Sequence, residues 1–239
     1  GVRDAEGYTF MGWSTKPMQS VSPQYEAEEK ITVNGNVDLY AVVFNRTTET
    51  DLTEDQLPQV DIYKYKQVIF VGDSRTEFME NVLTGMGESA TKNVKFVCSA
   101  GKGLDWFTTT GWAQLYSIVQ HDSNSILSKK TAVIFNFGVN DLSKSADYAE
   151  YYNWIAPQLK SKGCELYFMS VNPVNRLMLP NAGRADRSEA AVRSFNQYMK
   201  ANLSSAYTYI DMYSYLKSTG YSFASDHYGT GTVDDGLHY

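Results

Sequence analysis

Short apolar runs recur along the chain from residue 67 onward, separated by longer stretches of mixed polarity. Runs of this length predict buried strands, and the stretches between them are typical of helices. The expected strands are Gln67–Val71, Val94–Ala100, Thr131–Phe137, Glu165–Val171 and Tyr207–Met212. Continuous apolar strands that alternate with helices indicate a parallel sheet covered on both faces. With right-handed crossovers this predicts a three-layer α/β/α sandwich.

Two of the intervening stretches predict long helices, Asp147–Lys162 and Arg187–Leu203. In the second stretch, large apolar side chains return at helical spacing, namely Ala191, Phe195, Tyr198 and Met199. One face of that helix is therefore expected to pack on the sheet.

The beginning of the chain has a different pattern, rich in aromatic and β-branched residues. Within residues 1–45 we expect β structure at Tyr8–Trp13, Ile31–Val33 and Asp38–Val43. Residues 46–66 are largely polar and acidic toward their start, as in a linker, and residues 67–239 form the main domain. Forty-five residues are few for an independent core, so this small β segment needs a neighbour.

Composition and charge remove several function classes. The 239 residues are 43% hydrophobic, and the net charge of −6 with no basic cluster argues against nucleic acid. No apolar stretch approaches the roughly 18 residues needed to span a bilayer. Cys98 and Cys164 lie in strand-like runs and are expected to be buried thiols, so they do not identify a compartment.

Candidate chemistry lies where the predicted strands end, because loops at the carboxyl ends of parallel strands form sites. Gly72-Asp73-Ser74 follows the first strand and places a serine at a helix N-terminus, which favours developing negative charge. A helix N-cap is the alternative role for this serine.

The second and third strand ends supply glycine and amide groups. Gly101-Lys102-Gly103 lets backbone N–H groups approach a ligand, although a plain tight turn explains it too. A dinucleotide site is rejected, because Trp106 stands where the third glycine belongs. Asn140 can aim its amide at an oxyanion, with ordinary turn chemistry as the alternative.

The best candidate base is at the end of the chain. Asp235 and His238 are three residues apart, so one turn places carboxylate and imidazole on the same side. Of the other two histidines, His121 lies in a polar stretch and His227 has only an adjacent Asp226. The sequence contains no His-Glu-x-x-His, Cys-x-x-Cys or Gly-x-x-x-x-Gly-Lys motif.

Taken in order, Gly72-Asp73-Ser74, the glycine after the second strand, Gly138-Val139-Asn140-Asp141 and Asp235-x-x-His238 resemble the motif blocks of the SGNH (GDSL-like) hydrolases. The resemblance covers about residues 67–239. It implies a flavodoxin-like α/β/α sandwich with five parallel strands and ester hydrolysis without any metal or organic cofactor.

Carried over position by position, the resemblance implies a catalytic triad and an oxyanion hole. The triad is Ser74 as nucleophile, His238 as general base and Asp235 as its orienting partner, with Asp234 as the fallback. The oxyanion hole combines the backbone N–H groups of Ser74 and Gly103 with the side chain of Asn140. Gly101 is the alternative to Gly103, although spacing from the strand favours Gly103.

The first residues resemble the later half of short β repeats of bacterial surface proteins. The matching positions are Gly7-Tyr8-x-Phe10-x-Gly12-Trp13 and Leu39-Tyr40-Ala41-Val42, with Val43 or Phe44 in place of a closing tryptophan. This resemblance implies an extracellular or cell-surface bacterial protein with further modules. Because the chain begins Gly-Val-Arg and stops at Tyr239, before the family's closing helix, we expect a piece of something longer.

The leading hypothesis is an O-acyl esterase that removes acetyl groups from carbohydrates. Trp106, Trp112 and Tyr228 are candidates to stack on sugar faces, although packing explains most aromatic residues. Arg75 is a candidate guide for an anionic substrate, with an outward structural arginine as the alternative. The loop from Asn172 to Arg176 is expected to line the pocket.

Other functions stay open at this point. Lipid or aryl esters would suit the same residues. A non-catalytic adhesion module would not need the serine, histidine and aspartate together. A flavodoxin-like nucleotide binder shares the fold class but lacks a matching site.

Overall fold

The computed structural model describes residues 8–15, 25, 30–45, 64–87, 92–122, 130–174, 179, 187–219 and 237–238. Asp234, Asp235, His227 and Tyr228 lie outside the described residues. The chain divides into two compact units. One comprises Asp55–Pro173 and Ala191–Tyr213, and the other comprises Gly1–Glu54, Val174–Ala190 and Ser214–Tyr239.

The first of these units contains a five-stranded sheet in which every neighbouring pair is parallel. The strand order is β4-β3-β5-β6-β7, which is the 2-1-3-4-5 order of flavodoxin-like sheets. The strands are β3 (Gln67–Gly72), β4 (Val94–Cys98), β5 (Thr131–Asn136), β6 (Cys164–Met169) and β7 (Tyr207–Ile210). Each matches one predicted apolar run, so the predicted fold class is confirmed.

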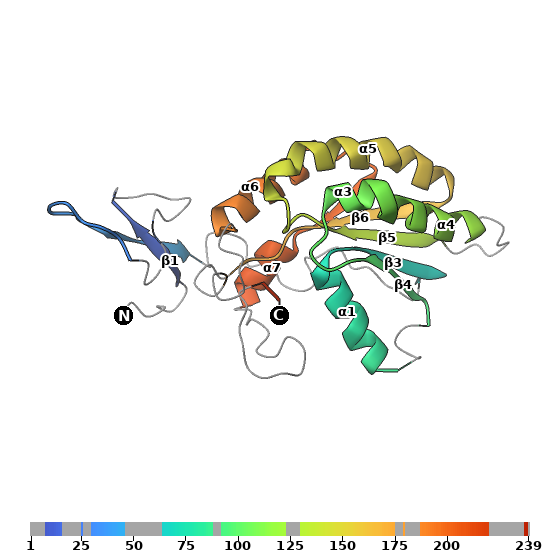
Figure 1. Cartoon of the computed structure of the whole chain (residues 1–239), viewed down its shortest axis with the longest axis horizontal. Helices are drawn as coiled ribbons and strands as arrows, with labels where there is room; N and C mark the ends of the chain where they lie inside the picture. Colours follow the sequence, from blue (N-terminus) through green and yellow to red (C-terminus); the bar gives the residue numbers. More distant parts are fainter. Residues whose placement is uncertain are drawn as a thin grey trace. The chain divides into compact units, whose positions relative to one another are not determined.

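Helices cover both faces of this sheet. Helix α1 (Ser74–Gly85) lies on one side, while the helices between β4 and β6 lie on the other (Figure 1). The latter are α3 (Leu104–Trp106), the π-helical turn η3 (Phe107–Gly111), α4 (Trp112–Asp122), the 3-10 turn η4 (Leu142–Lys144) and α5 (Ser145–Ser161). Two more helices follow, α6 (Glu189–Asn202) and α7 (Met212–Thr219). The predicted helices at 147–162 and 187–203 are α5 and α6.

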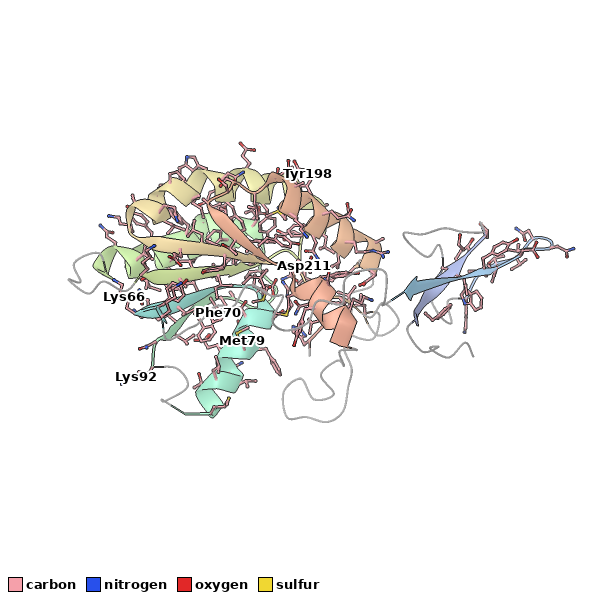
Figure 2. The ribbon with its side chains drawn as sticks, turned by 180° about the vertical axis from the view of Figure 1, so that it is seen from behind. Lys66, Phe70, Met79, Lys92, Tyr198 and Asp211 are labelled. Carbon is pink, nitrogen blue, oxygen red and sulfur yellow. The ribbon has the colours of Figure 1, made fainter. Side chains whose placement is uncertain are left out.

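The core follows from the alternation of side chains along each strand. On the α5 side, Phe135 of β5 packs against Tyr152 with ring centroids 4.7 Å apart, and Phe107 packs edge-on against it. The ring of Phe195 on α6 packs against that of Tyr148 on α5, with the ring centroids 5.4 Å apart. Side chains at alternate positions along a strand point to the opposite face of the sheet. One of these, Phe70 of β3, lies on the α1 side (Figure 2).

Tyr65 anchors the segment that leads into β3, although it lies within the predicted linker. Only 2% of its surface is exposed, and it packs with Val68 and Ile134 under the sheet. Its hydroxyl donates to a carboxylate oxygen of Glu165 and contacts the Tyr167 hydroxyl at 2.7 Å. This network lies at the amino ends of the strands, away from the candidate site.

The other unit contains a small antiparallel sheet of β1 (Tyr8–Ser14) and β2 (Tyr40–Asn45), with a bulge between Phe10 and Gly12. The strand expected at Ile31–Val33 is wrong, because those residues belong to no strand. Thr32 and Val33 are exposed, so a short β-prone run there has no apolar face to bury and no partner strand within the sheet.

Neither cysteine forms a disulfide. Cys164 is buried as expected, whereas Cys98 is only half-buried and its thiol donates to Glu80 of α1. Burial, followed by the hydrogen bond to Glu80, raises the pKa of the Cys98 thiol far above its ordinary range. Among the helices that the structure describes, none is long and apolar enough to cross a membrane.

Candidate active site

Ser74 is placed by the turn between β3 and α1. The helix is capped by Asp73, whose Oδ1 accepts a hydrogen bond from the backbone N–H of Arg75 at 3.1 Å. Ser74 is the first residue inside the helix and is 7% exposed. The alternative in which Ser74 is itself the N-cap is therefore wrong. The serine lies at a helix N-terminus, where backbone N–H groups and the helix dipole favour an anion.

Gly72 is needed for this turn because α1 packs directly onto the strand ends. A Cβ on Gly72 would lie 1.9 Å from Oγ1 of Thr76 and 3.0 Å from the backbone oxygen of Asn136. The first helical turn therefore has no room for a side chain at residue 72. The consequence is that Ser74 is held close to the carboxyl edge of the sheet.

Arg75 points into the protein, not outward. It is 6% exposed, and its guanidinium forms a fork with the fully buried Asp73, with Nε–Oδ1 at 3.0 Å and Nη2–Oδ2 at 2.9 Å. Nη2 also donates to the backbone oxygen of Asn136, the last residue of β5, at 3.1 Å. These contacts give Arg75 partners within the fold and leave little of it accessible to a substrate.

Gly103, which follows β4, lies against the carboxylate of Asp141, which follows β5 on the other side of β3. A Cβ on Gly103 would lie 2.3 Å from Oδ2 of Asp141, and that same oxygen accepts from the backbone N–H of Leu104 at 2.8 Å. Gly101 is different, because its φ is +70° and a Cβ there would meet nothing within 4 Å. Only Gly103 is thus enclosed by residues of the candidate site.

Asn140 is bonded to the same turn. Its amide Nδ2 donates to the backbone oxygen of Lys102 at 2.8 Å, which fixes the side chain beside Gly103. The expected oxyanion contributors Ser74, Gly103 and Asn140 therefore follow three adjacent strands, β3, β4 and β5, at one edge of one sheet.

Asp141 is a site residue that the sequence analysis did not single out. Its Oδ1 accepts from the hydroxyl of Tyr148 at 2.7 Å, while Oδ2 holds Leu104. Burial raises the pKa of the Asp141 carboxyl, and the bonds from Leu104 and Tyr148 act in the opposite direction. In the sequence, its position directly after Asn140 was the one feature that pointed to Asp141 as a site residue. Nothing local, however, identifies a partner 37 residues earlier.

His238 is described in the second compact unit, where it is 2% exposed beside the buried Leu237. Asp235 lies outside the described residues. Ser74 and His238 belong to different compact units. The catalytic triad therefore stays a prediction.

The remaining predicted substrate residues lie in defined positions. Trp106 is half-buried, with its ring centroid 6.1 Å from that of Phe137. The π-helical turn that follows needs Gly111, because a Cβ there would lie 2.8 Å from the Trp106 ring. Trp112 packs on Tyr116 at 5.3 Å.

Asn172 comes two residues after Ser170, at the carboxyl end of β6. It directly follows Val171, whose backbone N–H and C=O both bind the Asn196 side chain at 2.8 Å. Tyr228 lies outside the described residues. Within the described part of the chain, no group of three His, Cys, Asp or Glu side chains is arranged to hold a metal.

Comparisons with known proteins give structural likeness only. No protein-family model matches the sequence, and no curated protein matches it. Among solved structures, a candidate SGNH hydrolase from Slackia heliotrinireducens is 15% identical with a TM-score of 0.49, covering 73% of this chain and 90% of that one. An acetyl xylan esterase, AlAXEase, is 12% identical with a TM-score of 0.43, covering 72% and 90%.

A third structure, TesA, is 16% identical with a TM-score of 0.34, covering 56% of this chain and 71% of that one. None of these likenesses supports the resemblance of the N-terminal segment to a surface repeat. The assignment of the fold class rests on the strand order and the helical layers described above.

Proposed function

We propose that this protein is a serine esterase that hydrolyses O-acyl esters, with acetyl as the acyl group and a carbohydrate as the alcohol. One observation carries the proposal. Ser74 begins a helix at the carboxyl edge of the sheet, and the two neighbouring strand ends bring Gly103 and Asn140 into one hydrogen-bonded cluster. That combination suits an acyl-transfer site, which needs a nucleophile and donors for an oxyanion.

The proposed reaction proceeds through an acyl-enzyme. His238 accepts the proton of the Ser74 hydroxyl as its oxygen forms a bond to the ester carbonyl carbon, and Asp235 orients the imidazole. Collapse of the tetrahedral intermediate breaks the bond to the alcohol, which leaves with the proton from His238. Water then attacks the acyl group with His238 as base, which releases the acid and restores Ser74.

The negative charge of each intermediate is proposed to be held by three donors. These are the backbone N–H groups of Ser74 and Gly103 and the side-chain amide of Asn140. Each such donor contributes roughly 3–4 kcal/mol of transition-state stabilisation in comparable sites. Gly103 is preferred to Gly101, because Asp141 fixes the turn at Gly103.

The carbohydrate part of the proposal depends on Trp106 and Asn172. Trp106 is half-buried beside the oxyanion loop, where its ring can stack on a sugar face. Asn172 follows β6 at the same edge of the sheet and supplies amide groups for hydroxyls. An extracellular or cell-surface location in a bacterium belongs to this proposal, because polymeric acetylated glycans occur outside cells.

The test measures hydrolysis by the whole chain and by two serine variants. Acetate release is followed from p-nitrophenyl acetate, acetylated xylan, pectin and sialosides, and Ser74 is probed with a fluorophosphonate. Ser74→Ala should lower turnover by at least about 10³-fold and abolish labelling. The matched control is Ser161→Ala, because Ser161 lies at the end of α5 and its hydroxyl donates to the backbone oxygen of Gln158 in the same helix. It should behave as the wild type.

Each result has a defined meaning. Hydrolysis of the aryl ester without acetate from any glycan would refute the carbohydrate part and favour lipid or aryl esters. Failure of the wild type to hydrolyse any ester or to react with the fluorophosphonate would refute the enzyme and leave the adhesion module as the better hypothesis. Activity that survives in Ser74→Ala would show that the nucleophile lies elsewhere.

A further inference from the structure

We propose that Arg75 is a positioning residue for this reaction: its guanidinium locks the Ser74 turn to the strand end that carries Asn140. The inference rests on the proposed function, because it concerns the geometry of the same oxyanion site. It assigns Arg75 an internal role in place of the guidance of an anionic substrate.

The fork between Arg75 and Asp73 defines the turn on both sides of Ser74. Two parallel bonds, at 3.0 and 2.9 Å, hold a planar guanidinium against a carboxylate, and this geometry permits little rotation of either group. Asp73 also caps the helix through the backbone N–H of Arg75. Ser74 is therefore enclosed between two residues whose side chains are bonded to each other.

The same guanidinium reaches the next strand. Its bond to the backbone oxygen of Asn136 joins the β3 turn to the end of β5, four residues before Asn140. Asn140 is bonded to Lys102, and Asp141 to Leu104, so the third loop is tied to the second. The Arg75 bond therefore joins the loop of Ser74 to the end of β5, and the bonds of Asn140 and Asp141 join the following loop to the one that contains Gly103.

Arg75 also neutralises a charge beside the nucleophile. Asp73 is fully buried one residue before Ser74, and an uncompensated carboxylate there would oppose the negative charge that develops during acyl transfer. The Arg75 fork removes that penalty without presenting the guanidinium to solvent, because its side chain is only 5% exposed. The geometry and the charge both favour an action through Ser74 and the oxyanion donors.

The experiment separates position from charge with two substitutions. Arg75→Lys keeps a cation but loses the planar fork and the reach to Asn136. It should lower kcat for p-nitrophenyl acetate by about 10- to 100-fold, with KM within about 3-fold, because misplacement of about 1 Å costs that much. Phosphonylation of Ser74 should slow in parallel, since it passes through a similar oxyanion. Lys130→Arg is the control, because the exposed Lys130 lies just before β5 and pairs with Glu165 at the opposite end of the sheet, and it should leave both rates unchanged.

A second variant covers the case in which the buried lysine prevents folding. Asp73→Asn combined with Arg75→Gln removes both charges together, keeps a capping residue, and should still lose at least about 10-fold in kcat. A folded Arg75→Lys or double variant with wild-type kcat and labelling rate would overturn the inference while leaving the esterase intact. A rise in KM alone would instead assign Arg75 to substrate binding. A wild type with neither activity nor labelling would refute the proposed function and this inference with it.

Discussion

Replacement of Gly103 by alanine is the sharpest test of how the second and third strand ends are joined. The added Cβ would lie 2.3 Å from Oδ2 and 2.7 Å from Oδ1 of Asp141, closer than real contacts allow. The carboxylate must therefore move, and it would lose the bond from the Leu104 N–H that the structure has at 2.8 Å.

The magnitude follows from these two losses. Overpacking of a tight site costs about 1–3 kcal/mol, and a lost hydrogen bond to a charged group costs about 1.5–3 kcal/mol. Because relaxation makes such terms overlap, we expect Gly103→Ala to lower the free energy of unfolding by about 2–4 kcal/mol. If the backbone N–H of residue 103 moves by about 1 Å, ester hydrolysis should fall by about 10²-fold.

The assay is urea unfolding of four proteins in a double-mutant cycle: wild type, Gly103→Ala, Asp141→Ala and the double variant. Removing the Asp141 carboxylate makes room for the new methyl group. The double variant should therefore be about 1–2 kcal/mol more stable than the sum of the single effects predicts. Gly101→Ala is the comparison in the same loop, because its φ of +70° costs about 1–2 kcal/mol of backbone strain without any clash.

An additive cycle, or a Gly103→Ala variant with the stability and kcat of the wild type, would refute the reasoning. The first result would mean that the two residues are not in contact. The second would mean that the backbone at residue 103 is not confined by Asp141.

Two further predictions concern the opposite end of the sheet. Tyr65→Phe keeps the buried ring but removes the hydroxyl that donates to Glu165, and it should lower the free energy of unfolding by about 1–2 kcal/mol in urea titrations; an unchanged midpoint would contradict the bond. The hydrogen bond from Lys130, followed by that from Tyr65, lowers the pKa of Glu165 from 4.5 to about 2. The resulting stability is present above pH 4.5 and lost as the pH falls toward 2, so the advantage of the wild type over Glu165→Gln should shrink across that window. A stability advantage over Glu165→Gln that stays constant from pH 5 to pH 2 would contradict the lowered pKa of Glu165.

Much of the main domain could be predicted from the sequence because its central strands, β3 and β5, are buried on both faces. Such strands must be continuously apolar, and each of the five runs was recognised within a few residues of its observed bounds. The strand predicted at Ile31–Val33 was wrong for a different reason. Three β-prone residues carry no information about a partner strand, and the small sheet that the structure describes in this part of the chain pairs β1 with β2.

The site was predictable only as a set of candidates. The pattern of apolar runs places Ser74, Gly103 and Asn140 after the ends of strands. Because parallel strands have their carboxyl ends at one edge of the sheet, these residues were expected there together. The sequence left open whether Ser74 or its neighbour capped the helix and whether Gly101 or Gly103 faced the site. It also left open whether Arg75 pointed outward. Each question depends on atoms that belong to distant parts of the chain.

The sequence by itself determined the layers of this protein and the edge at which its chemistry gathers, because burial and periodicity are properties of consecutive residues. Only the tertiary structure decided which polar groups bind each other. The bonds from Arg75 to Asn136 and from Leu104 to Asp141 join residues 61 and 37 positions apart. Contacts of that kind exist only once the sheet has assembled, and they confine Ser74, Gly103 and Asn140 to one cluster.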